Sequence, residues 1–249
     1  MNFKRIILFI GVLFTCTSIY AQKNAFTFGV KLGGNIGAPL PFGNIPEGAT
    51  GAPLVGLNLG SWASYYLTPK LSLNLEFTYS VKGASFKTPL VNQYYEDVQY
   101  LPKADGGFEE VTIITVFNGN AEGKFDNQYL EWPILLSYKP GKKVCLIGGF
   151  YFAYMFSTAT YATGEGTIGY SPTVITRSLP FDEELNKFDF GPLLGAKYEN
   201  GGRFSFDGRM TYGIPSIFKE SYKTIDYSIN NFYFQFAVYY RFSKEMSIE

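Results

Sequence analysis

The chain has 249 residues with a formal net charge of zero, 18% aromatic residues, two cysteines and no histidine. Without histidine, Ser–His and Asp–His catalysis is excluded, and no zinc-binding spacing of ligands is possible. The balanced charge gives no electrostatic reason to expect a nucleic-acid partner.

The first residues have the features of a secretory signal peptide. Lys4 and Arg5 precede an apolar run over 6–14, and smaller or more polar residues follow. The pattern predicts an exported chain, with a cleaved signal peptide over 1–21 and a mature barrel domain over 22–249. The apolar run is too short for a transmembrane helix, and no later run reaches the required ~18 residues. A retained membrane anchor is the alternative interpretation.

Eight later segments alternate apolar and polar side chains, which is the period of a β-strand. In LSLNLEFTYSVK (71–82), Leu75 and Phe77 belong to the apolar series, and Glu76 and Lys82 belong to the polar series. Segments of about ten residues are long enough to cross a bilayer as strands tilted by ~45°. In chain order the segments are 26–33, 55–66, 71–82, 130–138, 144–156, 188–199, 203–212 and 232–242.

The connections between these segments are alternately long and short. Tight turns with Pro, Gly and Asn follow the second, fourth and sixth segments, at 68–70, 140–142 and 200–202. The other four connections are long, at 38–52, 84–126, 157–187 and 214–230. Outer-membrane barrels have short turns on the periplasmic side and long loops outside. We therefore predict an all-β fold: an eight-stranded antiparallel up-and-down transmembrane β-barrel in the outer membrane, with short periplasmic turns and four long extracellular loops.

The polar series carries nearly equal numbers of acidic and basic residues. If the apolar series faces lipid, these charges point into the barrel, where each needs a partner because an unpaired buried charge is costly. Small residues in the same series suit the narrow lumen of eight strands. A soluble barrel of the lipocalin type has the same alternation in the opposite sense, but the loop asymmetry and the signal peptide favour a membrane barrel. The predicted interior charge network comprises Lys31, Glu76, Lys82, Glu131, Asp189, Lys197, Asp207, Arg209 and Arg241.

Several segments also carry a family resemblance: FGVKLGGNIG (28–37), LSLNLEFTYSVKGASF (71–86), QYLEWPILLSYKP (128–140), LIGGFYFAYMF (146–156), KFDFGPLLGAKYE (187–199), FSFDGRMTYGI (204–214) and FQFAVYYRF (234–242). Together they resemble the PorT-like outer-membrane β-barrel proteins, and YLEWP and FDFGPLLG are the most specific segments. The resemblance implies an outer-membrane barrel. Because the name-giving member belongs to a secretion system, it also implies an accessory or scaffold role in protein secretion or envelope assembly. The long loops and the tail 243–249 depart from the family pattern.

The remaining motifs give no reason to expect catalysis or the binding of a cofactor or metal. GEGTIG (164–169) fits a dinucleotide-binding pattern, but Tyr170-Ser171-Pro172 follows it where that site needs a helix. We therefore expect a non-enzymatic protein without cofactor or metal. Side chains fill the lumen of an eight-stranded barrel, so bulk diffusion is not expected, and a narrow channel is a minor alternative.

The connection 84–126 is the candidate binding surface. VTIITVF (111–117) has the composition of a strand and 105–107 that of a turn, so a hairpin above the membrane is predicted. Long ordered loops often bind a partner, although a rigid extension of the flanking strands fits equally well. The candidate binding aromatics are Tyr94, Tyr95 and Tyr100. The expected partners are outer-membrane lipid and other envelope or secretion proteins, and a stand-alone binding or adhesion protein is the alternative to the accessory role.

Overall fold

The computed structural model describes residues 26–43, 45–103, 106–179, 181–222 and 227–242, without the side chains of Tyr95 and Asp97. The predicted signal peptide lies outside these ranges. Within them, no helix is long and apolar enough to cross a membrane. The chain forms strands and a short 3-10 helix, η2 (Asp182–Glu184). The strands are β1 (Phe26–Phe42), β2 (Thr50–Thr68), β3 (Leu71–Pro102), β4 (Phe108–Tyr138), β5 (Val144–Thr158), β6 (Tyr161–Ile168), β7 (Ile175–Ser178), β8 (Phe188–Glu199), β9 (Phe204–Ser216) and β10 (Ser228–Arg241).

Antiparallel pairs close most of these strands into a barrel. β1 pairs with β2 and β10, β2 with β3, and β3 with β4. The ring continues through β5, β8 and β9 back to β10. These ring strands correspond to the eight segments predicted from the alternation.

The sheet as a whole has ten strands, so the prediction of eight was incomplete. β6 and β7 lie in the predicted loop 157–187, where β6 pairs with β4 beyond the barrel and β7 pairs with β6. The buried residues of β6 are Ala162, Gly164 and Gly166, and its exposed residues include Thr163 and Glu165. With no large apolar side chain on the buried face, the segment lacks the alternation that signals a strand.

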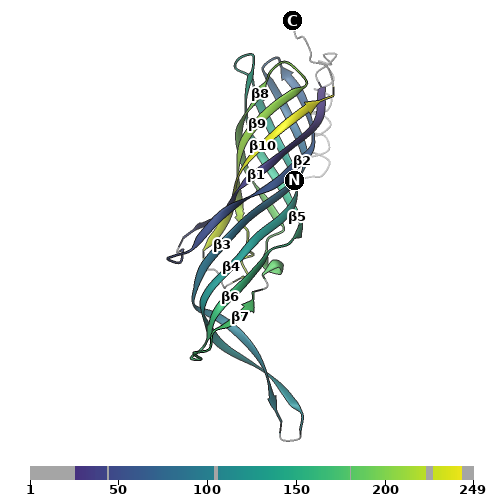
Figure 1. Cartoon of the computed structure of the whole chain (residues 1–249). Helices are drawn as coiled ribbons and strands as arrows, with labels where there is room; N and C mark the ends of the chain where they lie inside the picture. Colours follow the sequence, from purple (N-terminus) through teal and green to yellow (C-terminus); the bar gives the residue numbers. More distant parts are fainter. Residues whose placement is uncertain (1–25, 44, 104–105, 180, 223–226, 243–249) are drawn as a thin grey trace, which may run out of the picture.

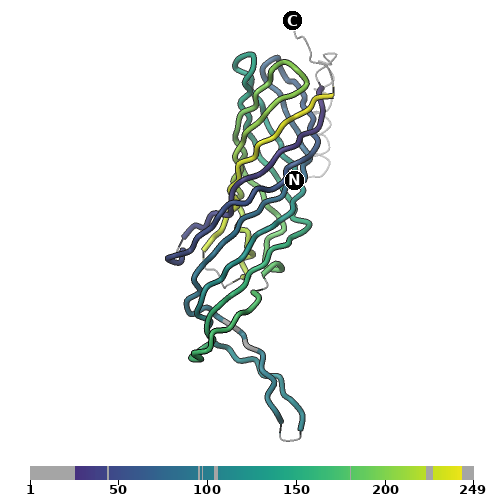
Figure 2. Tube along the Cα trace, viewed as in Figure 1, coloured from purple at the N-terminus to yellow at the C-terminus, as the bar shows by residue number. Residues whose placement is uncertain are grey.

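β3 and β4 continue far past the barrel as a paired extension, which projects at the bottom of Figures 1 and 2. Their pairing runs from Leu71↔Tyr138 to Pro102↔Phe108 with one register shift after Leu90. Most of the connection 84–126 is therefore strand, in agreement with the alternative of a rigid extension of the flanking strands, and the predicted hairpin is present. At its far end both faces of the extension are exposed. No face there has to be apolar, so the sequence shows no two-residue period.

The two ends of the barrel differ. Short turns join β2 to β3, β4 to β5 and β8 to β9 at the end where β1 begins and β10 stops, and the extension leaves from the opposite end (Figure 1). In the β8–β9 turn, Gly201 has φ +83°, and the Asn200 side chain accepts a 2.9 Å hydrogen bond from the Gly202 amide. These are the roles that Gly and Asn have in tight turns. We call the two ends the short-turn end and the extension end.

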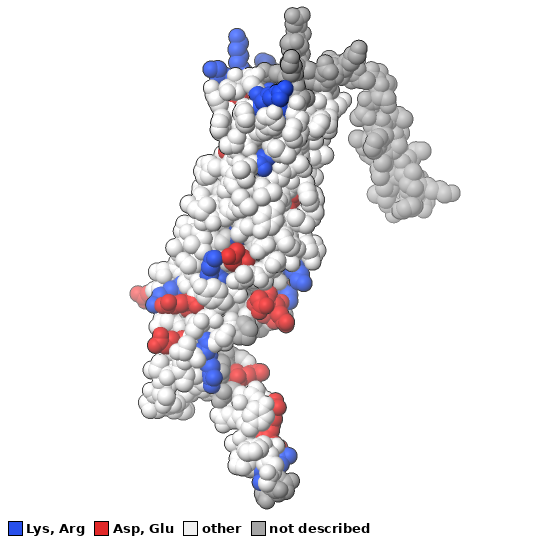
Figure 3. All heavy atoms as spheres, turned by 45° about the vertical axis from the view of Figure 1, so that its right-hand side comes forward, with Lys and Arg blue, Asp and Glu red and all other residues white. Residues whose placement is uncertain are grey.

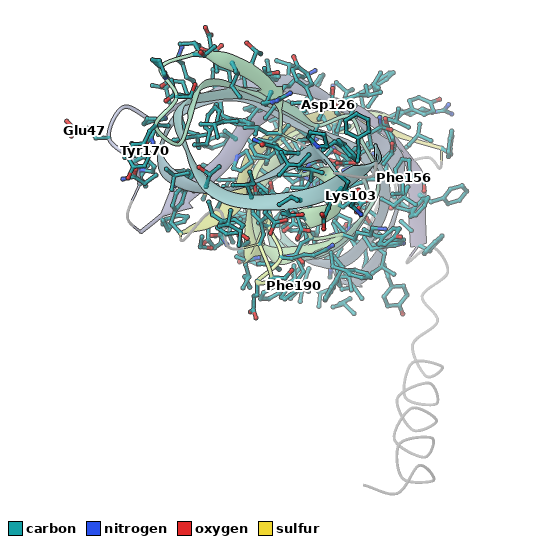
Figure 4. All side chains as sticks on the ribbon, turned by 90° about the horizontal axis from the view of Figure 1, so that it is seen from below. Glu47, Lys103, Asp126, Phe156, Tyr170 and Phe190 are labelled. Atoms are coloured by element: carbon teal, nitrogen blue, oxygen red, sulfur yellow. The ribbon has the colours of Figure 1, made fainter. Side chains whose placement is uncertain are left out.

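Apolar side chains point out of the barrel and polar ones point in. In β3, Leu75 is 51% exposed and Glu76 is 6% exposed. Seen from below, the labelled side chains of Phe156 and Phe190 lie at the periphery (Figure 4). Figure 3 shows a broad, largely uncharged surface between the charged ends. This sense of the alternation is that of a membrane barrel and opposite to that of a soluble one.

Glycines on the inner face let neighbouring strands approach closely. A Cβ atom added at Gly33 in β1 would overlap the carbonyl oxygen of Phe236 in β10. We expect Gly33→Ala to lower the free energy of unfolding by about 1–3 kcal/mol, because β1 and β10 must move apart. Gly141→Ala is the matched control, since the space around this turn residue is open. Urea unfolding in detergent micelles measures both, and equal stability of the two variants would contradict this packing.

Candidate functional sites in the lumen and on the extension

A network of charges from opposite walls crosses the lumen at Glu76. Glu76 in β3 lies 2.6 Å from the Lys31 ammonium in β1 and 3.1 Å from the Arg209 guanidinium in β9. Arg209 also lies 2.8 Å from Asp207. The Tyr239 hydroxyl in β10 is 2.8 Å from Glu76 and 2.9 Å from Asp207, within donating distance of both. We call these five residues the Glu76 cluster, in which each carboxylate has a cationic partner.

A second network, the Lys82 cluster, centres on Lys82 in β3. Its ammonium lies 2.9 Å from Glu131 in β4 and 2.9 Å from Asp189 in β8. Asp189 also accepts hydrogen bonds from the Tyr151 hydroxyl at 3.0 Å and the Asn231 amide at 2.9 Å. The ammonium further lies within 4.6–5.8 Å of the ring centroids of Tyr129, Tyr151 and Tyr233.

The two clusters connect opposite walls of the barrel. Their charged members are all buried. Because loss of one partner leaves a buried charge uncompensated, each cluster fixes the strands that contribute to it. The clusters also occupy the lumen with side chains, as expected for so narrow a barrel.

An aromatic cluster packs at the extension end of the barrel. Phe181, just before η2, and Phe218, after β9, have ring centroids 5.6 Å apart. Both rings also pack against Phe125 of β4, at 5.9 and 6.2 Å. Leu185 and Ile217 are buried in the same cluster. This aromatic cap of the barrel has no signal in the sequence, because most of its residues lie in connections without a periodic pattern and meet only in the folded barrel.

The structure places all residues of the predicted charge network inside the barrel except Arg241. This residue ends β10 at the short-turn end, is half-buried, and donates a 2.6 Å hydrogen bond to the Gly202 carbonyl. Strand parity assigned it to the lumen, but the strand stops there, so its long side chain reaches the rim. Lys197 is inside the barrel and 8% exposed, with its ammonium over the rings of Tyr239 and Trp62 at 4.7 and 5.4 Å.

The far part of the extension, residues 93–102 and 108–115, is a two-stranded structure that we call the ribbon. Within the described chain, β2 pairs with β3 only as far as Lys87, and β6 pairs with β4 only from Phe117. Neither edge of the ribbon therefore pairs with another strand. The ribbon nevertheless carries large exposed apolar and aromatic side chains: Tyr94, Val98, Tyr100, Leu101, Phe108, Ile113 and Ile114.

Two of the predicted binding aromatics lie on one face of the ribbon. Tyr94 is 58% exposed and Tyr100 is 64% exposed. The pairing Glu96↔Ile114 places Ile114 on the same face, because paired residues point to the same side of a sheet. Tyr95 pairs with Thr115 and so follows the opposite parity, and its side chain lies outside the described part of the structure. Tyr94 and Tyr100, two of the three aromatic residues predicted from the sequence, are therefore exposed on one face of the ribbon.

On the extension, outside the membrane-spanning part of the strands, glutamate side chains interact with neighbouring residues. Tyr94 donates a 2.6 Å hydrogen bond to Glu96, and this bond raises the pKa of the phenol. Nearer the barrel, Lys87 of β3 forms an ion pair with Glu122 of β4, and the hydrogen bond to Glu122 raises the pKa of the Lys87 ammonium. Both interactions are exposed and serve to hold neighbouring side chains rather than to prepare a group for proton transfer.

Neither a metal site nor a dinucleotide site is present in the described ranges. No group of three Asp, Glu or Cys side chains there is arranged to hold a metal ion. The GEGTIG segment belongs to β6 and to the turn that follows at Gly169. A dinucleotide site would need a helix at that point.

The closed antiparallel barrel, with its apolar exterior and charged interior, defines an integral outer-membrane β-barrel. The chain belongs to the family described as outer membrane protein beta-barrel domain, whose model matches residues 20–219. No curated protein matches the chain.

Solved structures with a similar arrangement include Ail, the attachment invasion locus protein of Yersinia pestis, in complex with the heparin analogue sucrose octasulfate. Ail is 12% identical to this chain, with a TM-score of 0.40 and coverage of 87% of this chain and 99% of Ail. The CymD monoaromatic hydrocarbon channel is 11% identical, with a TM-score of 0.23 and coverage of 88% and 90%.

Proposed function

We propose that this protein is a non-catalytic outer-membrane barrel that binds a partner through its ribbon. The observation that carries this proposal is the ribbon itself: a two-stranded structure with exposed apolar side chains, along which no further described strand is paired. An isolated hairpin is marginally stable in water. Its edges offer backbone hydrogen bonds to an added strand, and its aromatic side chains offer contact area.

The position of the ribbon supports the same function. In outer-membrane barrels the short turns face the periplasm and the longer connections face outward. With that orientation the ribbon projects outside the cell, beyond the lipid. Solute passage contributes little in this proposal, because the two charge clusters fill the lumen and the aromatic cap packs at its outer end.

A second candidate is an accessory role in secretion or envelope assembly, implied by the resemblance to PorT-like proteins. The observation that favours it is the basic short-turn end, where Lys70, Lys139, Lys142, Lys143 and Arg203 lie in or beside the turns. A periplasmic component with an acidic surface would meet this end rather than the ribbon.

Deleting the ribbon separates the two candidates. Replacement of residues 95–115 by Asn-Gly joins Tyr94 to Val116, which are already paired, through a two-residue hairpin turn. We expect this variant to keep the barrel's unfolding midpoint, because β6 still pairs with β4 from Phe117, and to lose partner binding. The readout is photo-crosslinking in intact cells, from position 100 of the ribbon in the full-length protein and from position 142 of a short turn in both the full-length protein and the deletion variant.

A discrete crosslinked product from position 100, absent from position 142, supports ribbon binding. Products from position 142 alone, unchanged by the deletion, would overturn it in favour of the accessory role.

A further inference from the structure

The β4 edge of the ribbon presents backbone groups to an added strand, in line with β6. The Gly169 amide, just after β6, donates a 2.8 Å hydrogen bond to the Val116 carbonyl, so the backbone of Val116 points away from β3. Successive residues of a strand direct their backbone groups to opposite edges, and those of Ile114, Thr112 and Glu110 therefore point to the same outer edge as Val116. The pairing of β6 ends before these residues, and no other described strand pairs with them on this side.

The other edge of the ribbon, formed by β3, is interrupted at its base. The pairing of β3 with β4 shifts register between Leu90 and Gln93, and Asn92 in this shift has φ +52°. A bulge of this kind bends an edge strand and hinders further pairing. Residues 108–117 of β4, by contrast, pair with β3 without a shift. The β4 edge is therefore the better template for a partner strand.

The ribbon is acidic. It contains Glu96, Asp97, Glu109 and Glu110 and no basic residue, and its connecting turn adds one residue of each sign. Figure 3 shows acidic side chains on this projection. Among the side chains that the structure describes, no ion pair involves Glu96, Glu109 or Glu110. A basic partner would supply the missing cations, whereas a second copy of the ribbon would add the same negative excess.

Charge and apolar surface are separated along the β4 edge. Glu109 and Glu110 lie toward the tip of the ribbon, one on each face. Ile113 and Ile114 lie toward its base, both exposed and again one on each face. A strand added here places its side chains opposite these residues, so it needs apolar residues at one end and basic residues at the other. In antiparallel pairing the basic residues come last along the partner chain.

We propose that the ribbon binds an extended basic segment of another polypeptide, which pairs with the β4 edge as an added strand. This inference rests on the proposed binding function of the ribbon and specifies its partner. Backbone hydrogen bonds to Glu110, Thr112 and Ile114 provide affinity. Basic side chains opposite Glu109 and Glu110 select the partner. The sequence Ile-Val-Thr-Val-Lys-Lys has this pattern, with apolar residues followed by a basic pair.

Fluorescence polarisation with a dye-labelled peptide of this sequence tests the proposal, with the folded protein in nonionic detergent at constant ionic strength. We expect saturable binding, which the replacement of 95–115 by Asn-Gly abolishes. The matched probe is the same peptide N-methylated at its first, third and fifth residues, because it keeps the side chains and the charge but cannot donate strand hydrogen bonds. It should bind about tenfold more weakly or worse. Equal affinity of the two peptides would overturn strand addition.

Proline substitutions identify the edge. Thr112→Pro removes an outward-pointing amide from the β4 edge, and Val98→Pro does the same on the β3 edge, since these two residues are directly paired. Neither amide points into the β3–β4 ladder, so both variants should fold. We expect Thr112→Pro to weaken peptide binding by about tenfold and Val98→Pro to leave it unchanged. The reverse result would overturn the assignment to β4.

A double variant, Glu109→Gln with Glu110→Gln, tests the charge. Loss of two cross-strand charge pairs should weaken peptide binding by about three- to tenfold and reduce its dependence on salt. Glu122→Gln is the control, because this carboxylate lies nearer the barrel in an ion pair with Lys87, and it should leave the affinity unchanged. A double variant that binds the peptide as tightly as the wild type would overturn the basic partner.

Failure of this inference differs from failure of the proposed function. Crosslinked products from position 100 in cells, without binding of the basic peptide, would keep the ribbon as a binding surface and overturn the basic partner. A product of twice the mass of the chain would identify a second copy of the protein as the partner and likewise overturn it. Saturable peptide binding without any product from position 100 would support the strand-binding edge and contradict the function proposed in cells.

Discussion

Lys82→Met should lower the free energy of unfolding by about 3–5 kcal/mol, the cost of breaking a buried ion pair from one side. Lys82 lies 2.9 Å from both Glu131 and Asp189, and all three side chains are buried. Without the ammonium, two carboxylates remain in the lumen with no cation between them. The measurement is the urea dependence of folding in detergent micelles, followed by tryptophan fluorescence.

The matched control is Lys87→Met, which removes the same functional group from the same strand. Its ion pair with Glu122 is exposed, with the two side chains 56% and 61% accessible. Exposed pairs contribute about 0–1 kcal/mol, so this variant should unfold close to the wild type.

Neutralising the carboxylates tests the reason for the loss. The combination of Lys82→Met with Glu131→Gln and Asp189→Asn should recover most of the stability, since no uncompensated charge remains. If Lys82→Met alone unfolds like Lys87→Met, water in the lumen screens the cluster, and the cluster does not hold the walls together.

Leu75→Arg should prevent assembly or cost about 2–4 kcal/mol, because the side chain is placed in the lipid-facing band near the middle of a barrel strand. Leu75 is 51% exposed, between the buried residues Asn74 and Glu76. On a water-exposed surface such a position would tolerate arginine with a change within about 0.5 kcal/mol. Urea titrations of the variant folded into lipid vesicles measure the difference.

Ile114→Arg is the control for the lipid face. Ile114 is 68% exposed on the ribbon and is also apolar and strand-borne, but it lies outside the barrel. We expect this variant to fold with wild-type stability. A Leu75→Arg protein that folds and stays soluble without detergent would show that the apolar exterior faces water.

The sequence alone was sufficient to predict which face of each strand points out of the barrel. In a strand that crosses a membrane, every second side chain meets hydrocarbon, so the apolar series of 71–82 and its counterparts identifies the outer face. The turn residues of 68–70, 140–142 and 200–202 likewise identified the short-turn end, because tight turns require Pro, Gly or Asn. The alternation and the turns are local constraints that a few consecutive residues reveal, whereas the choice of a membrane barrel over a soluble one also needed the loop asymmetry and the signal peptide.

The extension could be predicted only in part. VTIITVF (111–117) indicated a strand, but residues 93–102 have no alternation because both faces of the far extension are exposed. The length of the paired extension and the added strands β6 and β7 depend on hydrogen bonds between segments that carry no pattern.

Only the tertiary structure decided which charges meet. Parity placed Lys82 and Asp189 in the lumen, yet their contact joins residues 107 positions apart on strands that are not neighbours in the sheet. Such contacts depend on how the closed ring staggers its strands, which no single strand encodes. The same closure placed the Lys197 ammonium over two aromatic rings and put Arg241 at the rim. The period of two therefore determined the face of each residue, and the closure of the barrel determined its partner.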